Sequence, residues 1–202
     1  MIGIFENQRM KACRIIGLTI IFSFCLSSNL WAWDLEVGAR ALIPRIGAGE
    51  QEYEDESGNK TTFKPEPESI ATGVSYHLGI RLGSYQIDFD TSTFNYQSTL
   101  TADNDAVTED TTIDATIRER RLGVNYHLER ELAGLFAGIG ISDIEETLES
   151  DDRTWTFKTT SPYLKAGLDL ILGNLILRYE QIYLSMGEHS VQINSGGIIF
   201  RF

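Results

Sequence analysis

Hydrophobic and polar residues alternate one by one over most of the chain after its first apolar run, which is typical of β-strands whose two faces meet different surroundings. The first such stretch, 33–43, places Trp33 and Leu35 on one face and Asp34 and Glu36 on the other. Seven further stretches alternate in the same way: 70–82, 85–91, 122–128, 134–142, 155–170, 175–183 and 198–202. None of them reaches the roughly 18 consecutive apolar residues of a membrane-spanning helix. The pattern therefore predicts an all-β protein of eight strands.

The connections between these stretches alternate in length. Three are short: 83–84, 129–131 and 173–174. Four are longer and polar: 44–68, 97–112, 145–153 and 185–190. An even number of strands with short turns on one side and long loops on the other is the layout of a membrane-spanning barrel. We therefore expect an eight-stranded antiparallel transmembrane up-and-down β-barrel over residues 33–202, with Pro65 and Pro67 breaking any strand in the first loop.

The alternation slips once, within the sixth stretch. The phase of the apolar residues before Pro162 differs from the phase of Leu164 and Leu168 after it. Proline cannot donate a ladder hydrogen bond, so we expect a β-bulge at Pro162.

Charged residues recur near the middle of the strands, on their polar face. Among the charged residues with this parity are Glu36, Arg40, Asp88, Lys165, Arg178 and Glu180. Eight strands enclose room for side chains only, so we expect these six to point into the bore, pair with one another and close it. His77 and His127 share the same parity, and we expect them to be hydrogen-bonded structural residues. A water-filled channel lined by these charges is the alternative.

A water-soluble barrel would reverse this arrangement, with the apolar face inside and the charges outside. The alternation alone separates the two arrangements only weakly. The membrane arrangement is favoured because glycines and long charged residues together fill a narrow bore. A closed barrel also satisfies every backbone polar group in hydrocarbon, which an open sheet does not.

The first 32 residues have the three-part pattern of a secretory signal peptide. Lys11 and Arg14 precede an uncharged apolar run, 15–26, and polar residues follow it. This run is too short to span a bilayer as a helix. We expect cleavage between Ala32 and Trp33; an uncleaved N-terminal anchor is the alternative.

Removal of this segment leaves a strongly acidic chain without cysteine. Of the 17 basic and 29 acidic residues, three and one lie in the segment, so the expected mature net charge is −14. Such a chain is repelled by nucleic-acid phosphates, and we expect no nucleic-acid partner. Both cysteines, Cys13 and Cys25, are removed, which excludes a disulfide scaffold or a thiolate metal site from the mature chain.

The C-terminus carries the most specific pattern in the chain. Ile198, Phe200 and Phe202 share one face of the last strand, and the chain ends on Phe202. This ending resembles the terminal strand of bacterial outer-membrane barrels, and the whole mature chain resembles the small eight-stranded barrels of the OmpA/OmpX type in its layout. The resemblance implies the outer membrane of a Gram-negative envelope and contact with its lipid and lipopolysaccharide. It also implies that the barrel-assembly machinery recognises these three residues.

Candidate catalytic chemistry is confined to Glu188, His189 and Ser190. A hydrolase of the lipid-modifying kind needs a nucleophile, a base and an orienting acid that meet on one face. Consecutive residues on a strand point to opposite faces, so we expect no catalytic site. The chain has 3 histidines, dispersed without metal-ligand spacing, and we expect neither a metal site nor a cofactor.

A further group of charged residues offers a phosphate contact at the outer headgroups on charge grounds: Arg118, Glu119, Arg120, Arg121, Arg153 and Lys158. We expect a non-enzymatic barrel whose acidic loops have a structural or surface-interaction role. Its extracellular ligand is not identified, because fold alone does not determine function. Passage of small molecules across the outer membrane and lipid modification by an enzyme are the alternatives.

Overall fold

The computed structural model describes residues 33–47, 50–67, 71–102, 111–150, 153–187 and 189–202. The expected signal segment 1–32, with Ala32 at its end, lies outside the described residues. Ten strands follow one another along the described chain: β1 (Trp33–Ile46), β2 (Gln51–Asp55), β3 (Lys60–Pro67), β4 (Thr72–Leu82), β5 (Tyr85–Ala102), β6 (Thr111–Glu129), β7 (Ala133–Ser150), β8 (Arg153–Leu172), β9 (Leu175–Met186) and β10 (His189–Arg201).

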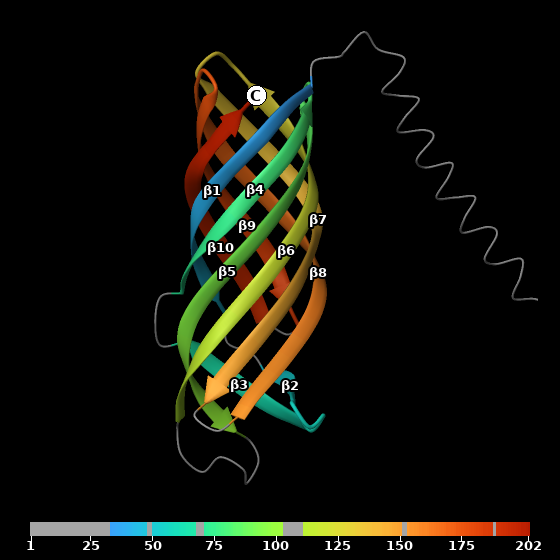
Figure 1. Ribbon diagram of the computed structural model, residues 1–202, viewed down its shortest axis with the longest axis vertical. Helices are drawn as coiled ribbons and strands as arrows, with labels where there is room; N and C mark the ends of the chain where they lie inside the picture. Colours follow the sequence, from blue (N-terminus) through green and yellow to red (C-terminus); the bar gives the residue numbers. More distant parts are fainter. Residues whose placement is uncertain (1–32, 48–49, 68–70, 103–110, 151–152, 188) are drawn as a thin grey trace, which may run out of the picture. The chain divides into compact units, whose positions relative to one another are not determined.

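Eight of these strands form a closed antiparallel barrel (Figure 1). Their order around the wall is β4-β1-β10-β9-β8-β7-β6-β5, and pairing of β5 with β4 completes the circle. The first and last wall strands close the barrel over a long ladder, from Glu36 opposite Arg201 to Ile46 opposite Val191. The expected eight-stranded up-and-down barrel is confirmed.

Short connections join the strands at one end of the barrel, which we call the turn end; the opposite end is the loop end. The β4–β5 and β8–β9 turns both contain a glycine with positive φ, Gly83 at 61° and Gly173 at 66°. L-residues with a side chain rarely adopt this conformation, so glycine is the residue that makes these tight turns possible. Both turns lie where the sequence predicts them.

The strands extend further toward the loop end than predicted. β5 runs to Ala102, β7 to Ser150 and β6 begins at Thr111, so much of two expected loops, 97–112 and 145–153, is strand. The first expected loop contains a hairpin, β2–β3, and the prediction that prolines break any strand there is wrong. Pro65 and Pro67 lie in β3 beyond Phe63, where β2 no longer pairs and one edge of β3 needs no N–H donor.

The β2–β3 hairpin gives the loop end a second closed ring of strands. β3 pairs with β5 beyond the end of β4, from Pro67 opposite Ser98 to Phe63 opposite Ala102. β2 pairs with β3 on one side and with β8 on the other. The ring β3-β5-β6-β7-β8-β2 is therefore closed by hydrogen-bonded neighbours, and the hairpin crosses the loop end as a cap (Figure 1).

The expected bulge at Pro162 is absent. β7 and β8 pair without interruption from Ala133 opposite Leu170 to Ser150 opposite Arg153, with Pro162 opposite Ile141. The parity of β8 does not change either, because Trp155, Tyr163 and Lys165 all point inward. What changes at Pro162 is the type of residue that faces inward. The apparent slip in the sequence is a reversal of polarity.

This reversal occurs at one level on four neighbouring wall strands, β5 to β8. The outward row Phe89–Leu122–Ile141–Pro162 is apolar, whereas the next outward row toward the loop end, Thr91–Arg120–Asp143–Thr160, is polar. The inward rows change in the opposite sense, from Asp90–Arg121–Ser142–Ser161 to Phe94–Ile117–Glu146–Phe157, in which Glu146 is the one charged member. Toward the turn end the barrel is apolar outside and charged inside, and toward the loop end it is the reverse.

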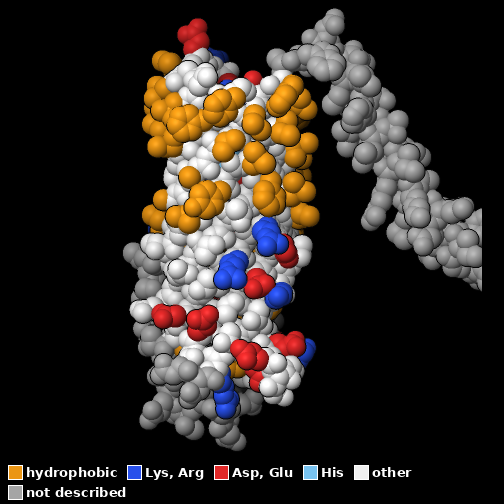
Figure 2. Space-filling model, viewed as in Figure 1, with side chains coloured by type: hydrophobic (Ala, Val, Ile, Leu, Met, Phe, Trp, Pro, Cys, Tyr) orange, Lys and Arg blue, Asp and Glu red, His pale blue; other side chains and the backbone are white. Residues whose placement is uncertain are grey.

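Exposed apolar side chains surround the turn-end half and form what we call the apolar belt. Ile139 is 63% exposed and Leu164 is 61% exposed. An apolar surface that continues around the whole barrel would be unfavourable in water. Figure 2 shows these side chains gathered over the turn-end half of one face, with the charged residues beyond them. No helix in the described part of the chain is long and apolar enough to cross a membrane.

Candidate functional site

Charged side chains fill the bore at the level of the apolar belt. The six residues of the expected network all point inward and are at most 4% exposed: Glu36, Arg40, Asp88, Lys165, Arg178 and Glu180. Buried charges are stable only when they are paired and hydrogen-bonded. Their partners therefore show how the bore is closed.

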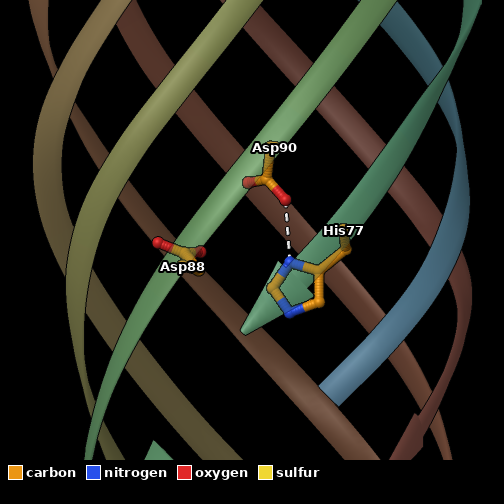
Figure 3. Close-up of side chains that lie close together, drawn as sticks. All are labelled: His77, Asp88 and Asp90. Carbon is orange, nitrogen blue, oxygen red and sulfur yellow. Dashed lines mark hydrogen bonds and ion pairs between the residues drawn. The ribbon is translucent and has the colours of Figure 1, made fainter. Parts of the chain in front are cut away.

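The middle of the bore is organised by Arg40 of β1. Its guanidinium donates to Glu180 on β9 and to Asp90 on β5, each two strands away from β1 in the wall. Asp90 also bonds to Nδ1 of His77, at 2.7 Å (Figure 3). Arg121 lies beside Asp90, with 3.9 Å between Nη2 and Oδ2. Sequence parity placed Arg40 and Glu180 in the bore, but the roles of Asp90 and Arg121 were missed, although both share the inward parity.

Lys165 of β8 donates to Asp88 and lies 3.8 Å from the second carboxylate oxygen of Asp90. His77, Asp88 and Asp90 are close enough together to share one cation (Figure 3). A divalent ion at this position would have to displace the Lys165 ammonium and the Arg40 guanidinium from the two carboxylates. The geometry therefore favours a charge cluster over a metal centre.

A second cluster lies nearer the turn end. Arg178 donates to both oxygens of Asp169, at 2.7 and 2.8 Å, and to Glu36 at 3.1 Å. Arg201 donates to Glu36 and to Glu129. His127, Glu129 and Asp169 also have metal-compatible spacing, but here too arginines occupy both carboxylates.

Glycines on the inward face make room for the large bore residues. A Cβ on Gly167 would lie 2.4 Å from Cζ of Phe136, and a Cβ on Gly123 would lie 2.1 Å from the hydroxyl oxygen of Tyr163. Both distances are shorter than any real contact. The rings of Phe136 and Tyr163 therefore fit in the bore because nearby strands carry glycine beside them.

An apolar core fills the loop-end ring beyond the charged bore. Its buried members come from the cap and from the wall: Tyr53, Phe63, Phe94, Tyr96, Ile113, Ile117, Ile144, Leu148 and Trp155. The rings pack edge to face, with centroids 5.1 Å apart for Phe63 and Trp155. The bore thus meets a dry, packed region before it reaches the loop end.

Glu146 is a fully buried carboxylate inside this core. It accepts hydrogen bonds from Tyr96 on β5 and from Tyr53 on β2, the latter at 2.8 Å. Burial, reinforced by the Glu146 carboxylate, raises the pKa of Tyr53 and of Tyr96 above the ordinary tyrosine range. The sequence interpretation missed this group because 145–153 was expected to be a loop. The alternation of Ile144, Glu146 and Leu148 with polar neighbours is the sequence pattern that could have predicted a buried Glu146 on a strand.

The expected phosphate-contact group is divided by the wall. Glu119 and Arg121 point into the bore, so their assignment to the headgroups is wrong, whereas Arg118 and Arg120 point outward just beyond the apolar belt. Lys158 is also outward and pairs with Glu145 at 2.9 Å. The Lys158 ammonium keeps the pKa of Glu145 below its usual value. Arg153 lies further out, at the start of β8.

The candidate catalytic residues lie at the start of β10. His189 and Ser190 are consecutive there, opposite Met186 and Ser185. Glu188 and the side chain of His189 lie outside the described residues, so the expectation that these residues form no catalytic site stays a prediction.

Several solved structures are similar to this fold. Neisserial surface protein A matches with a TM-score of 0.57 at 11% sequence identity, covering 83% of this chain and 97% of that chain. Ail, the attachment invasion locus protein of Yersinia pestis, in complex with the heparin analogue sucrose octasulfate, matches with a TM-score of 0.53 at 13% identity, covering 84% and 97%. No family model and no curated protein matches the chain.

At these identities the likeness establishes the fold, and the chain's own exposed residues establish its surroundings. A closed barrel with a continuous apolar belt and charged side chains inside is stable in lipid and unstable in water. Long loops of such barrels face outward from the cell and short turns face the periplasm. This protein is therefore an outer-membrane β-barrel of the small eight-stranded fold, with its loop end at the cell surface.

Proposed function

We propose that this protein is a non-enzymatic surface-interaction barrel, which holds a rigid, acidic, water-facing ring above the outer membrane. The observation that carries the proposal is the reversal of polarity between the Phe89 row and the Thr91 row. Beyond that level the strands continue with an apolar core and a polar exterior, as in a soluble protein. A chain that needed only a membrane plug would gain nothing from this extension.

The bore argues against passage of small molecules. Paired charges fill it at the level of the lipid, and the packed core of Tyr53, Phe63 and Trp155 lies between those charges and the cell surface. A permeating solute would have to separate buried ion pairs and then cross an apolar core. Both steps cost several kcal/mol.

Lipopolysaccharide is the expected lipid partner. Arg118, Arg120 and Lys158 point outward immediately beyond the apolar belt, at the level of the outer headgroups. Guanidinium and ammonium groups bind phosphate through charge-assisted hydrogen bonds. The neighbouring carboxylates of Asp143 and Glu145 are suited to divalent ions that bridge to the same phosphates.

Assembly of the barrel is proposed to depend on its C-terminus. Ile198, Phe200 and Phe202 are exposed on one face at the turn end, and Phe202 pairs with Leu35 of β1 through two backbone hydrogen bonds. Export by cleavage between Ala32 and Trp33 and recognition of these three residues by the barrel-assembly machinery remain part of the proposal. Deletion of Phe202 should lower the membrane-inserted yield while secretion continues.

The experiment compares cells that make the full protein with cells that make a variant in which 51–67 is replaced by a short Gly-Ser link. Heat-modifiable gel migration verifies that both barrels fold. We expect cells with the variant to adhere less to immobilised surface polymers than cells with the full protein. Solute uptake and lipid composition should be the same in both. Unchanged adherence, with altered uptake or altered lipids, would contradict a surface-interaction role.

A further inference from the structure

A cleft separates the cap from the wall on one side of the loop-end ring. β2 pairs with β8 only at Glu54 opposite Thr156 and Asp55 opposite Trp155, and then diverges from it. The space between the diverging strands has a volume of about 520 Å³. We call it the β2–β8 cleft; its lining comes from the cap (Gln51–Glu56 and Lys60) and from β8 (Thr154 and Thr156–Lys158).

The β8 side of the cleft includes Phe157 and Lys158, which begin an open strand edge. The ladder between β8 and β9 begins at Tyr163 opposite Leu184, and the ladder between β8 and β2 ends at Thr156. Among the described residues, the part of β8 from Phe157 to Pro162 therefore pairs only with β7. An unpaired edge presents a row of N–H and C=O groups that can accept another strand. Pro162 has no N–H and marks the limit of this edge.

The lining of the cleft is acidic around an aromatic base. Four carboxylates belong to it, Glu52, Glu54, Asp55 and Glu56, against two ammonium groups, Lys60 and Lys158. Lys60 pairs with Glu52 at 2.6 Å. Phe157 and Tyr53 form the base, with ring centroids 5.9 Å apart. A ligand that enters here meets net negative charge and an apolar surface beneath it.

Gln51 provides a separate indication of a ligand. Its side chain lines the cleft and is only 6% exposed, yet its Oε1 has no hydrogen-bond donor among the described residues. A buried acceptor without a donor is unfavourable, because it has lost its hydrogen bonds to water and gained none in return. A ligand that brings an N–H group to this position would relieve that cost.

We propose that the β2–β8 cleft binds an extended, cationic peptide segment of an external protein, which adds as a strand to the free edge of β8. Main-chain hydrogen bonds to β8 would supply affinity, and alternate basic side chains would meet the carboxylates of β2. The inference rests on the proposed surface-interaction role and names the class of partner for it. A polyanion such as the sulfated sugar bound to Ail would be repelled by this lining.

The binding test uses the full protein in lipid nanodiscs and a fluorescent ten-residue peptide of alternating lysine and valine. Fluorescence anisotropy should report saturable binding that weakens as salt is raised, whereas the glutamate–valine peptide should not bind. Two further lysine–valine peptides carry N-methyl groups on the odd or on the even amides. Because only one edge of the added strand faces β8, we expect one of them to lose affinity by at least about tenfold. Equal binding of both methylated peptides and the parent, or no binding of the parent, would overturn the proposal.

A charge-reversal pair locates the site. Glu54→Lys should weaken binding of the lysine–valine peptide about fivefold, whereas Glu149→Lys, an exposed carboxylate on β7 outside the cleft, should leave it unchanged. Equal effects of the two changes would show that the peptide is attracted by the general surface charge, which contradicts the proposed site. If the peptides fail while replacement of 51–67 still abolishes adherence, this inference is wrong and the surface role stands. If both fail, both are wrong.

Discussion

At the scale of single residues, the bore shows what parity does and does not reveal. Alternation placed Arg178, Lys165 and Glu180 on the inward face, because the side chains of a strand repeat every two residues. It did not reveal their partners, which depend on barrel diameter and strand stagger. Arg40 and Glu180, for example, are 140 residues apart in the chain and meet in the bore from strands separated only by β10.

Removing Arg178 tests the value of one such pairing. Its guanidinium binds Asp169 and Glu36 and lies 4.7 Å from the centre of the Phe136 ring. Arg178→Ala should leave the buried Asp169 carboxylate without its arginine, leave Glu36 to Arg201 and Gln86, and lower the free energy of unfolding by about 3–5 kcal/mol. Urea unfolding in lipid vesicles measures the loss, with Arg45→Ala, an exposed arginine on β1, as the control. Equal stability of the two variants would mean that water replaces the guanidinium without cost.

The two buried tyrosines of the loop-end core predict a dependence of stability on alkaline pH. The pKa values of Tyr53 and Tyr96 are raised in the folded state by burial and by Glu146. Stability from these phenols is therefore fully present below the unfolded pKa of about 10 and is lost as the pH rises above it. Denaturation monitored by Trp155 fluorescence between pH 8 and 11 should show this decline, and Tyr53→Phe with Tyr96→Phe should reduce its slope. If the free energy of unfolding falls with pH equally steeply in the double variant, Tyr53 and Tyr96 are not the groups responsible.

At the scale of secondary-structure elements, the central parts of the wall strands were predictable and their loop-end extensions were not. In 94–102 and 143–150 apolar residues change to the inward parity, so a search for a continuous outward apolar face ends at the reversal. The cap was missed for a related reason. Tyr53 and Phe63 are single aromatic residues among polar ones, and their burial depends on pairing of β3 with β5 and of β2 with β8.

Amide hydrogen exchange tests the open edge of β8. Because successive N–H groups of a strand point to opposite sides, alternate amides between Phe157 and Thr160 should exchange as unpaired groups, while the others stay protected by β7. The control is 164–170, where β9 covers the same edge. Uniform protection across 157–160 would contradict the free edge and with it the proposed strand addition.

At the scale of the whole molecule, lipid and water together determine which face of the barrel sheet is apolar at each level. The same strands meet lipid near the turn end and water near the loop end, and each face takes the polarity that its surroundings require. The fold class could be predicted from strand count and connection lengths because those features do not depend on which face is apolar. The level along the barrel axis at which water replaces lipid could not be predicted from the sequence, because it depends on the register of neighbouring strands.

Electrical recording tests the closure of the bore. Planar bilayers containing the reconstituted protein should show no sustained conductance steps, because buried ion pairs and the apolar core lie in series along the axis. The variant lacking 51–67 should stay closed as well, since the charges around Arg40 remain in place. Large, stable conductance of the complete protein would mean that the bore contains continuous water.

The outward face of β6 changes from lipid-facing to water-facing between Leu122 and Arg120, and a cysteine scan along this strand tests that change. Single cysteines at the outward positions Leu122, Arg120, Thr116 and Asp114, and at the inward position Ile117, are exposed to a membrane-impermeant thiol reagent on intact cells. We expect rapid labelling at 120, 116 and 114, and no labelling at 122, which faces lipid, or at 117, which faces the apolar core. Labelling at 117, or protection at 116 and 114 equal to that at 122, would contradict that change.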